Sequence, residues 1–241
     1  MPFQKYTLPI VALVDEAPHV RTFLFDAPEG LTWEPGAHCH VALPGFDEGG
    51  RPNRELVRHM SVCTLPEEGK LGFTTRLNSS DSPFKRALAG MSAGDELVFF
   101  KFGSILGLPD DGRPVVLLSQ GVGIASMRPL VLDFARRREA GGFSRTPSLT
   151  SVNVGREGAA IYAAQLGALA AEGLAMTRVT SRVAFEDAVR ALPNPAGSVF
   201  EVVGSSRFLL STIALLRSLG VADDSIVLDK KPEKAATFFS A

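Results

Sequence analysis

The pattern of hydrophobic residues changes once along the chain, near residues 107–114, and this change constrains the fold more than any other feature. Before it, six short runs are each closed by turn residues: YTLPIVALVDE, VRTFLFDAP, AHCHVALPG, LVRHMSVCT, KLGFTTRLN and DELVFFKFG. Short alternating or apolar runs of this spacing are typical of antiparallel sheets. We therefore expect a six-stranded antiparallel Greek-key β-barrel over residues 1–109. One helix, SPFKRALAGM, is expected within it, with Ser82 at the N-cap and Pro83 at the first helical position.

After the turn-rich segment GLPDDGRP, strands alternate with helices. The predicted strands are VVLLS, LTSVNV, MTRVTS, SVFEVVG and SIVLD, and the predicted helices are SMRPLVLDFARRREA, AAIYAAQLGALAAE, FEDAVRAL and SRFLLSTIALLRSLG. Continuous apolar strands separated by helices are typical of a parallel sheet covered on both faces. The second half, residues 110–241, is therefore predicted to be a doubly wound, Rossmann-like α/β domain with a parallel five-stranded sheet.

Composition excludes several classes of protein. Lys and Arg total 25 against 26 Asp and Glu, so no overall positive field favours nucleic acid or an anionic membrane. Two cysteines, Cys39 and Cys63, cannot build a disulfide framework or supply four thiolates to an iron–sulfur cluster. No signal peptide is visible and no window holds 18 uninterrupted apolar residues. We expect a cytoplasmic protein, held in a reducing compartment. We also expect that the chain does not span a membrane.

The segment RHMSVCT, residues 58–64, places an arginine and two hydroxyls three residues apart at the end of a predicted strand. A guanidinium matches phosphate oxygens with two parallel hydrogen bonds, and hydroxyls add further donors. A phosphate is therefore the expected ligand. The alternative is an exposed strand end that carries one charge.

Taken in order, these segments resemble the ferredoxin reductase superfamily of flavoproteins over residues 5–230. The family's Arg-x-Tyr-Ser segment corresponds to Arg58-His59-Met60-Ser61. Further blocks follow in the family's order: WEPGAHCHV, SPFKRAL, GDELVFFKFG, SQGVGIAS and VVGSSRFLLSTIALLRSLGV. The resemblance implies an NAD(P)H:acceptor oxidoreductase that binds FAD and passes electrons between a nicotinamide dinucleotide and a redox protein such as ferredoxin or flavodoxin.

For the flavin, the resemblance implies that Arg58 binds a phosphate and that Ser61 is the catalytic hydrogen-bond donor beside the reactive flavin nitrogen. Met60 stands where the family has tyrosine, and its thioether can still contact a flavin face. The start of the helix at Ser82 would form a second anion site, which favours FAD over FMN; an ordinary N-cap is the alternative. The remaining residues expected to line this groove are Val62, Thr74 and Thr75.

For the nicotinamide dinucleotide, Gly121-Val122-Gly123 follows a predicted strand and opens a helix, where glycines let the backbone approach a pyrophosphate. A tight turn without a ligand is the alternative. The chain departs from the family at Gln120, Ala125 and Ser126, and Val203-Gly204-Ser205 replaces the family's Cys-Gly-Pro. By resemblance Gly204 and Ser205 also bind the cofactor, and Arg156 lies where the adenosine end is recognised. The choice between NADH and NADPH stays open.

Two further questions stay open at this point. The altered glycine segment permits a flavin-binding electron-transfer subunit or sensor with weak or lost use of nicotinamide, and a flavin-free interaction protein is a third candidate. His38, His40, His59 and Cys63 do not have the spacing of a metal site, so no metal is expected. Phe238-Phe239 either covers a flavin face or lies in a short amphipathic helix packed on the second domain, and the helix is favoured because Pro232 can start it.

Overall fold

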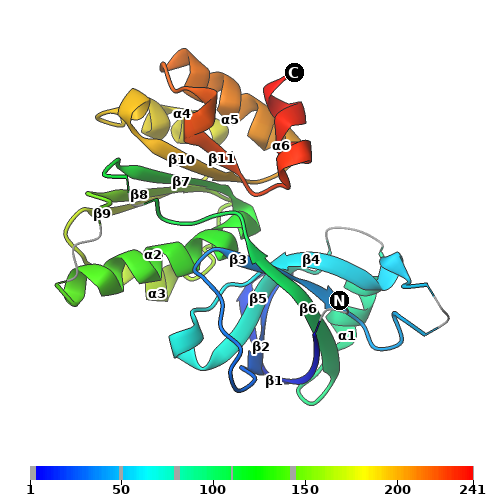
Figure 1. The fold of residues 1–241 in the computed structure, drawn as a ribbon. Helices are drawn as coiled ribbons and strands as arrows, with labels where there is room; N and C mark the ends of the chain where they lie inside the picture. Colours follow the sequence, from blue (N-terminus) through cyan, green and yellow to red (C-terminus); the bar gives the residue numbers. More distant parts are fainter. Residues whose placement is uncertain (1–3, 49–50, 79–81, 110, 142–144, 241) are drawn as a thin grey trace. The chain divides into compact units, whose positions relative to one another are not determined.

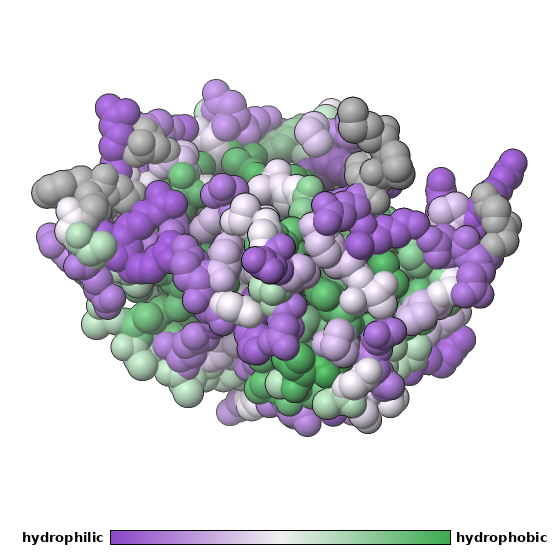
Figure 2. All heavy atoms as spheres, turned by 60° about the horizontal axis from the view of Figure 1, so that its bottom comes forward, coloured by the Kyte–Doolittle hydropathy of each residue, from purple (hydrophilic) through white to green (hydrophobic). Residues whose placement is uncertain are grey.

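The computed structural model describes residues 4–48, 51–78, 82–109, 111–141 and 145–240. The chain divides into two compact units, Met1–Ser104 and Ile105–Ala241, whose elements are labelled in Figure 1. No helix within these described ranges is long and apolar enough to cross a membrane. On the face drawn in Figure 2, polar side chains are interspersed with smaller apolar areas.

The first unit is a six-stranded antiparallel sheet with one α-helix, as predicted. Its strands lie in the order β4-β3-β6-β1-β2-β5. They are β1 (Lys5–Ala17), β2 (Val20–Asp26), β3 (Ala37–Ala42), β4 (Val57–Ser61), β5 (Lys70–Arg76) and β6 (Glu96–Ser104). β4 and β5 are therefore the two edge strands. The chain just after β4 approaches β5, because the Cys63 N–H donates to the Gly72 carbonyl at 2.8 Å.

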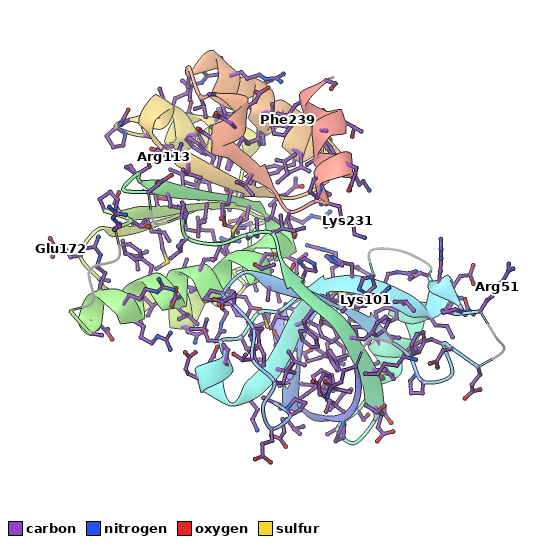
Figure 3. All side chains as sticks on the ribbon, in the orientation of Figure 1. Arg51, Lys101, Arg113, Glu172, Lys231 and Phe239 are labelled. Atoms are coloured by element: carbon purple, nitrogen blue, oxygen red, sulfur yellow. The ribbon has the colours of Figure 1, made fainter. Side chains whose placement is uncertain are left out.

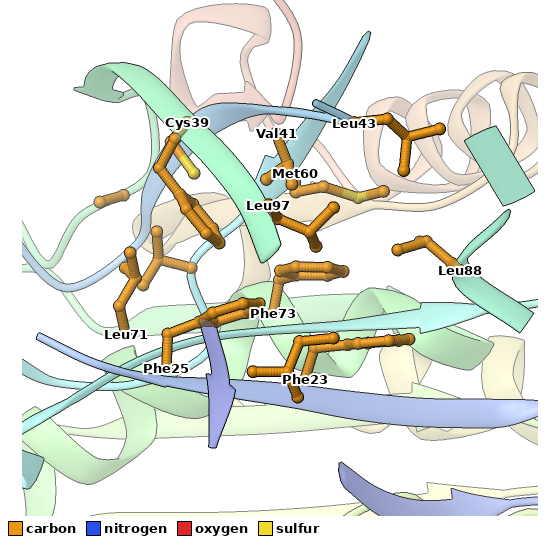
Figure 4. Close-up of a cluster of buried hydrophobic side chains, with 14 of the residues drawn as sticks. Phe23, Phe25, Cys39, Val41, Leu43, Met60, Leu71, Phe73, Leu88 and Leu97 are labelled. Carbon is orange, nitrogen blue, oxygen red and sulfur yellow. The ribbon is translucent and has the colours of Figure 1, made fainter. Parts of the chain in front are cut away.

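Phenylalanine dominates the core of this unit (Figure 4). The rings of Phe23 and Phe73 stack with centroids 5.1 Å apart, and Phe25 meets Phe99 edge-on at 4.7 Å. Such pairs add about 0.5–1.5 kcal/mol each beyond the burial of their area. The core positions recur at every second residue of β2, β5 and β6, which is why the alternating pattern predicted these strands.

Helix α1 (Pro83–Gly90) closes one end of this core. The Ser82 Oγ accepts a hydrogen bond from the Lys85 N–H at 3.3 Å, and Pro83 occupies the first turn, so the predicted N-cap is confirmed. Phe84 and Leu88, four residues apart, are both fully buried. This one-sided burial fixes the helix against the sheet.

The second unit is a five-stranded parallel sheet in the order β11-β10-β7-β8-β9, again as predicted. The strands are β7 (Val115–Gln120), β8 (Leu149–Val154), β9 (Leu174–Val179), β10 (Val199–Val203) and β11 (Ile226–Leu228). The helices are α2 (Ile124–Glu139), α3 (Ala163–Gly167), α4 (Arg182–Arg190), α5 (Ser206–Ser218) and α6 (Pro232–Phe239). The strand order reverses at β7, which has β8 on one side and β10 on the other.

Helix α3 is much shorter than the sequence predicts. The sequence predicts one helix over residues 159–172, but only Ala163–Gly167 is helical. Tyr162, just before it, has a φ of 57°, a left-handed conformation that an α-helix cannot contain. Within the helix only Leu166 is buried, so the alanine-rich sequence has little apolar surface to hold a longer helix against the sheet.

The C-terminal segment forms helix α6 and packs on the second unit. Phe238 is 7% exposed and belongs to the same core as Phe208 and Ile213 of α5. The Arg217 guanidinium donates to the Phe239 carbonyl at 2.7 Å, and Figure 3 labels the Phe239 side chain on this helix. Of the two alternatives for the tail, the structure shows the packed amphipathic helix.

Candidate functional site

Arg58 lies at the start of edge strand β4, next to α1. Its Nη1 donates to the carbonyls of Arg54, Glu55 and Val57 at 3.2, 3.1 and 2.6 Å, which fixes the side chain. The guanidinium carbon lies 5.7 Å from the centre of the Phe84 ring. Among the described residues, no carboxylate is within ion-pair distance, and Nε and Nη2 have no hydrogen-bond acceptor. This fork is therefore available to an anion.

A second cation, Lys85, lies close to Arg58. Its Nζ donates to the Thr75 Oγ1 and, at 2.9 Å, to the Arg76 carbonyl at the end of β5. Burial lowers the pKa of Lys85 to about 8, and the nearby charge of Arg58 acts in the same direction. No sequence motif marks Lys85, because its partners lie on a strand about ten residues earlier in the chain. Two adjacent cations without a carboxylate partner among the described residues form a site that favours an anion.

β4 divides the predicted flavin residues between its two faces. Arg58 pairs with Val41 and Met60 with Cys39, both core residues, whereas Ser61 pairs with His38 on the other face. The side chains of Arg58 and Ser61 therefore lie on opposite faces of β4. A single ligand could contact both only at the free edge of this strand. Ser61 is half-buried at the end of β4.

The other predicted flavin residues are largely buried. Met60 is 9% exposed and packs in the core, where Figure 4 shows it near Val41 and Leu97, so contact with a flavin would require its side chain to leave this packing. Val62 is 1% exposed, and its N–H donates to the Ala37 carbonyl. The side chains of Thr74 and Thr75 are also buried. Their strand is the second edge of the sheet, so the backbone can still line a groove.

In the second unit, the glycine segment forms the turn between β7 and α2. Gly121 has a φ of 55°, which favours glycine. A Cβ on Gly123 would lie 2.9 Å from the Val203 carbonyl oxygen, so only glycine lets this turn approach the end of β10. The buried Asn153 Nδ2 donates to the Ser119 Oγ at 2.8 Å and to the Gly121 carbonyl at 3.3 Å. Val122 is half-buried between the two glycines.

Gln120 connects the turn after β7 to the turn after β10. Its Oε1 accepts hydrogen bonds from the Ser205 N–H at 3.2 Å and from the Ser205 Oγ at 2.8 Å. Ser205 is also the N-cap of α5, and Gly204 has no room for a Cβ beside the Phe208 ring. The structure thus brings Gly121-Val122-Gly123 and Gly204-Ser205 together, where the strand order of the sheet reverses.

A cavity of about 440 Å³ opens beside these turns. Such reversal points are where open α/β sheets bind ligands. Arg182, the first residue of α4, is held by Glu186 at 2.9 Å and lies about 5 Å from the Phe185 and Phe208 rings. Arg207 is exposed at the start of α5. The cavity is lined by Gln120, Arg182, Glu186, Ser205, Arg207, Phe208 and Ser211.

The sequence interpretation missed Arg182 and Arg207. A signal was available, because each follows the carboxyl end of a parallel strand and enters the first turn of a helix, where the helix dipole also favours an anion. Arg156, which was identified, is exposed, and its carbonyl accepts from the Arg178 Nη2 at 2.5 Å. Arg178 lines a second, largely apolar cavity of about 210 Å³ together with Ile124, Ser151, Asn153, Ile161, Ala163, Leu166, Gly167, Met176 and Thr177.

The histidines of β3 and β4 form a ring cluster on the sheet face opposite the core. The centroids of His38 and His59 are 4.2 Å apart, and His40 stacks on Phe100 at 5.3 Å. Over the part of the chain that the structure describes, no group of three His, Cys, Asp or Glu side chains could hold a metal ion. Cys39 and Cys63 are buried and not bonded to each other.

No family model matches the sequence, and no curated protein matches it. Solved structures do match. A ferredoxin NADP+ reductase from Neisseria gonorrhoeae with bound FAD and NADP has a TM-score of 0.76 and 20% identity, covering 93% of this chain and 98% of its own. The ferredoxin reductase in carbazole 1,9a-dioxygenase has a TM-score of 0.75 and 15% identity, and the Amycolatopsis cytochrome P450 reductase GcoB has 0.72 and 20%; each covers 95% of this chain and 70% of its own. The chain therefore has the two-domain fold of ferredoxin reductase-like proteins.

Proposed function

We propose that this chain is an FAD-dependent NAD(P)H oxidoreductase. The observation that carries the proposal is the pair of cations, Arg58 and Lys85, beside the edge strands β4 and β5, with no carboxylate partner among the described residues. An anionic cofactor would neutralise this pair. The fold is the one seen in a ferredoxin NADP+ reductase whose structure contains FAD and NADP.

In the proposed site, Arg58 holds a flavin phosphate and Ser61 donates a hydrogen bond to the reacting edge of the flavin. Val62, Thr74 and Thr75 line the groove through their backbone, and the α1 start at Ser82 completes it. Met60 would contact the flavin by moving its side chain out of the core. The bound flavin would supply the redox chemistry, which is two-electron exchange with a nicotinamide and one-electron exchange with a protein partner. This chain's residues orient the cofactor and exclude water from it.

The second unit is proposed to bind the nicotinamide dinucleotide. Gly121, Val122 and Gly123 allow its pyrophosphate to approach the backbone, and Gly204 and Ser205 lie beside them across the Gln120 hydrogen bonds. Arg182 and Arg207 supply positive charge in the adjoining cavity, and Arg156 is proposed to contact the adenosine end. A small redox protein such as ferredoxin or flavodoxin is the proposed acceptor.

One observation favours a second function, a flavin-binding electron-transfer subunit or sensor that uses nicotinamide poorly. The Gln120 side chain bridges the two turns where the dinucleotide would lie, so binding would have to displace it or reach around it. This residue is one of the departures from the family's glycine segment.

An absorbance spectrum of the purified protein tests the flavin, and stopped-flow mixing with NADH and NADPH tests the enzyme. Flavin absorbance that is bleached promptly by either nucleotide is the expected result. Bound flavin that neither nucleotide reduces would favour the electron-transfer subunit. A chain that binds no flavin would contradict both functions and leave the interaction protein.

A further inference from the structure

Lys85 is a half-buried cation of the first unit with no carboxylate partner among the described residues. Removing an ammonium even partly from water without a counter-ion is costly. Its Nζ donates to two oxygens, the Thr75 Oγ1 and the Arg76 carbonyl, both on β5. An ammonium has three donors, and the third has no acceptor among the described residues.

The charge that acts on Lys85 has the same sign. Arg58, on β4, disfavours the ammonium electrostatically. Arg76, the last residue of β5, and Arg86, the next residue of α1, are cationic as well. The described residues of these elements bring no carboxylate to the ammonium. Burial and the Arg58 charge together hold the Lys85 pKa near 8, so the empty site already destabilises its own charged form. An anion placed between the two cations would remove this penalty.

The start of α1 offers few free backbone N–H groups, so an anion bound beside it needs a donor from a side chain. Pro83 has no N–H, and the Lys85 N–H is already bonded to the Ser82 Oγ. Of the first three helical residues, only Phe84 keeps a backbone donor for a ligand. A second phosphate contact beside Arg58 therefore depends on the Lys85 ammonium more than on the helix terminus.

We propose that Lys85 acts with Arg58 as a two-point clamp for the diphosphate of FAD, and that FAD binding takes up a proton at this lysine. The proposal rests on the proposed function. The Arg58 fork contacts one phosphate and the compact Lys85 ammonium contacts its neighbour. The proton comes from the buffer and goes to the Lys85 Nζ, and no other bond changes.

The direction of the pH effect follows from linkage. At pH 8 about half of the Lys85 side chains in the empty site are neutral, whereas a bound diphosphate favours the ammonium and raises its pKa. Binding then draws about half a proton at pH 8 and almost none at pH 6.5. The affinity for FAD falls about fivefold between pH 8 and pH 9, because Lys85 is neutral in a larger fraction of the empty molecules and must be protonated on binding.

Isothermal titration calorimetry of FAD into the flavin-free full chain measures this uptake directly, in buffers of different ionisation enthalpy at pH 6.5, 8 and 9. The wild type should take up about half a proton at pH 8. Lys85→Met should take up none and bind roughly tenfold or more weakly at pH 7. Lys85→Arg should also take up none, while its affinity stays level up to pH 9, because arginine does not titrate there.

Lys70→Met is the matched control, since Lys70 also lies on β5 but pairs with the exposed Asp26 carboxylate. It should leave proton uptake unchanged. Binding of FAD by the wild type without proton uptake, or equal uptake in Lys85→Met, would overturn the clamp and leave the proposed function standing. Absence of FAD binding by the wild type at every pH would overturn both. If Lys85→Met does not fold, Lys85→Arg carries the comparison.

Discussion

At the scale of single residues, the buried carboxyl group of Glu201 is unusual, because carboxyl side chains normally lie in contact with water. Glu201 is 1% exposed in the middle of β10. Its Oε1 accepts the Gly107 N–H at 2.8 Å, whereas its Oε2 is buried with no partner among the described residues. Burial raises the Glu201 pKa to about 8 despite the Gly107 hydrogen bond, and the Asp229 charge adds to the increase.

This pKa makes a prediction about stability. Between pH 4.5 and about pH 8 the folded chain keeps a proton on Glu201 that the unfolded chain has lost. The free energy of unfolding therefore falls as pH rises through this interval, by up to about 1.4 kcal/mol per pH unit from this residue. Glu201→Gln, which keeps the acceptor for Gly107, should remove that slope. Urea melts from pH 5 to pH 9 measure it, and parallel curves for the two proteins would contradict the prediction.

Ser61 supports a prediction about rate. As the proposed donor to the reacting edge of the flavin, it should matter most where charge shifts in the transition state. We expect Ser61→Ala to keep its flavin and to be reduced by nicotinamide roughly five- to tenfold more slowly, the loss of one neutral hydrogen bond. Stopped-flow absorbance gives the rate, and Ser61→Thr, which keeps the hydroxyl, is the control. Equal rates in the alanine variant and the wild type would reject this role.

At the scale of elements, α6 should contribute to the stability of the second unit. Ending the chain at Lys234 removes Phe238, which is 7% exposed. The burial of a side chain of this size contributes about 1.5–3 kcal/mol to the free energy of unfolding. The melting temperature should fall while the absorbance spectrum of the bound flavin stays the same. Phe238→Ala should have the same effect with most of the helix retained. A shifted flavin spectrum with unchanged stability would instead support an aromatic cover over the flavin.

Elements with a strong period were predictable, and sites that depend on contacts between distant segments were less so. Most strands of the described residues follow from alternation and apolar runs, because they bury one or both faces. β9 is the exception, since none of its residues is fully buried. The length of α3 was not predictable, since the left-handed Tyr162 leaves no mark in the sequence. Arg58 and the two glycine turns stand out locally. Lys85 does not, because its significance comes from Thr75, Arg76 and Arg58, which only the folded sheet brings to it.

At the scale of the whole molecule, two units with separate cores imply separate ligand effects on unfolding. The single tryptophan, Trp33, is buried in the first unit and donates to the Thr64 carbonyl at 2.9 Å, so its fluorescence reports that unit alone. FAD at 100 times its dissociation constant should stabilise the tryptophan transition by about 2.7 kcal/mol. NADP+ should instead shift only the part of the circular dichroism melt that tryptophan does not follow. One transition, common to both probes and raised by either ligand, would contradict this.

The edge strands β4 and β5 have a consequence beyond the proposed binding of a cofactor. A strand edge with unpaired backbone groups is a template for pairing with a strand of another chain, and proteins commonly protect such edges with charge or with a covering group. Here Arg58, Lys85 and the start of α1 lie beside these edge strands, and the positive charge of the two side chains discourages another strand from docking. A ligand bound there would neutralise this charge, but the ligand itself would then cover the strand edges. The groove proposed to bind a cofactor would thus also protect the chain against aggregation, by charge before a cofactor binds and by occupancy afterwards.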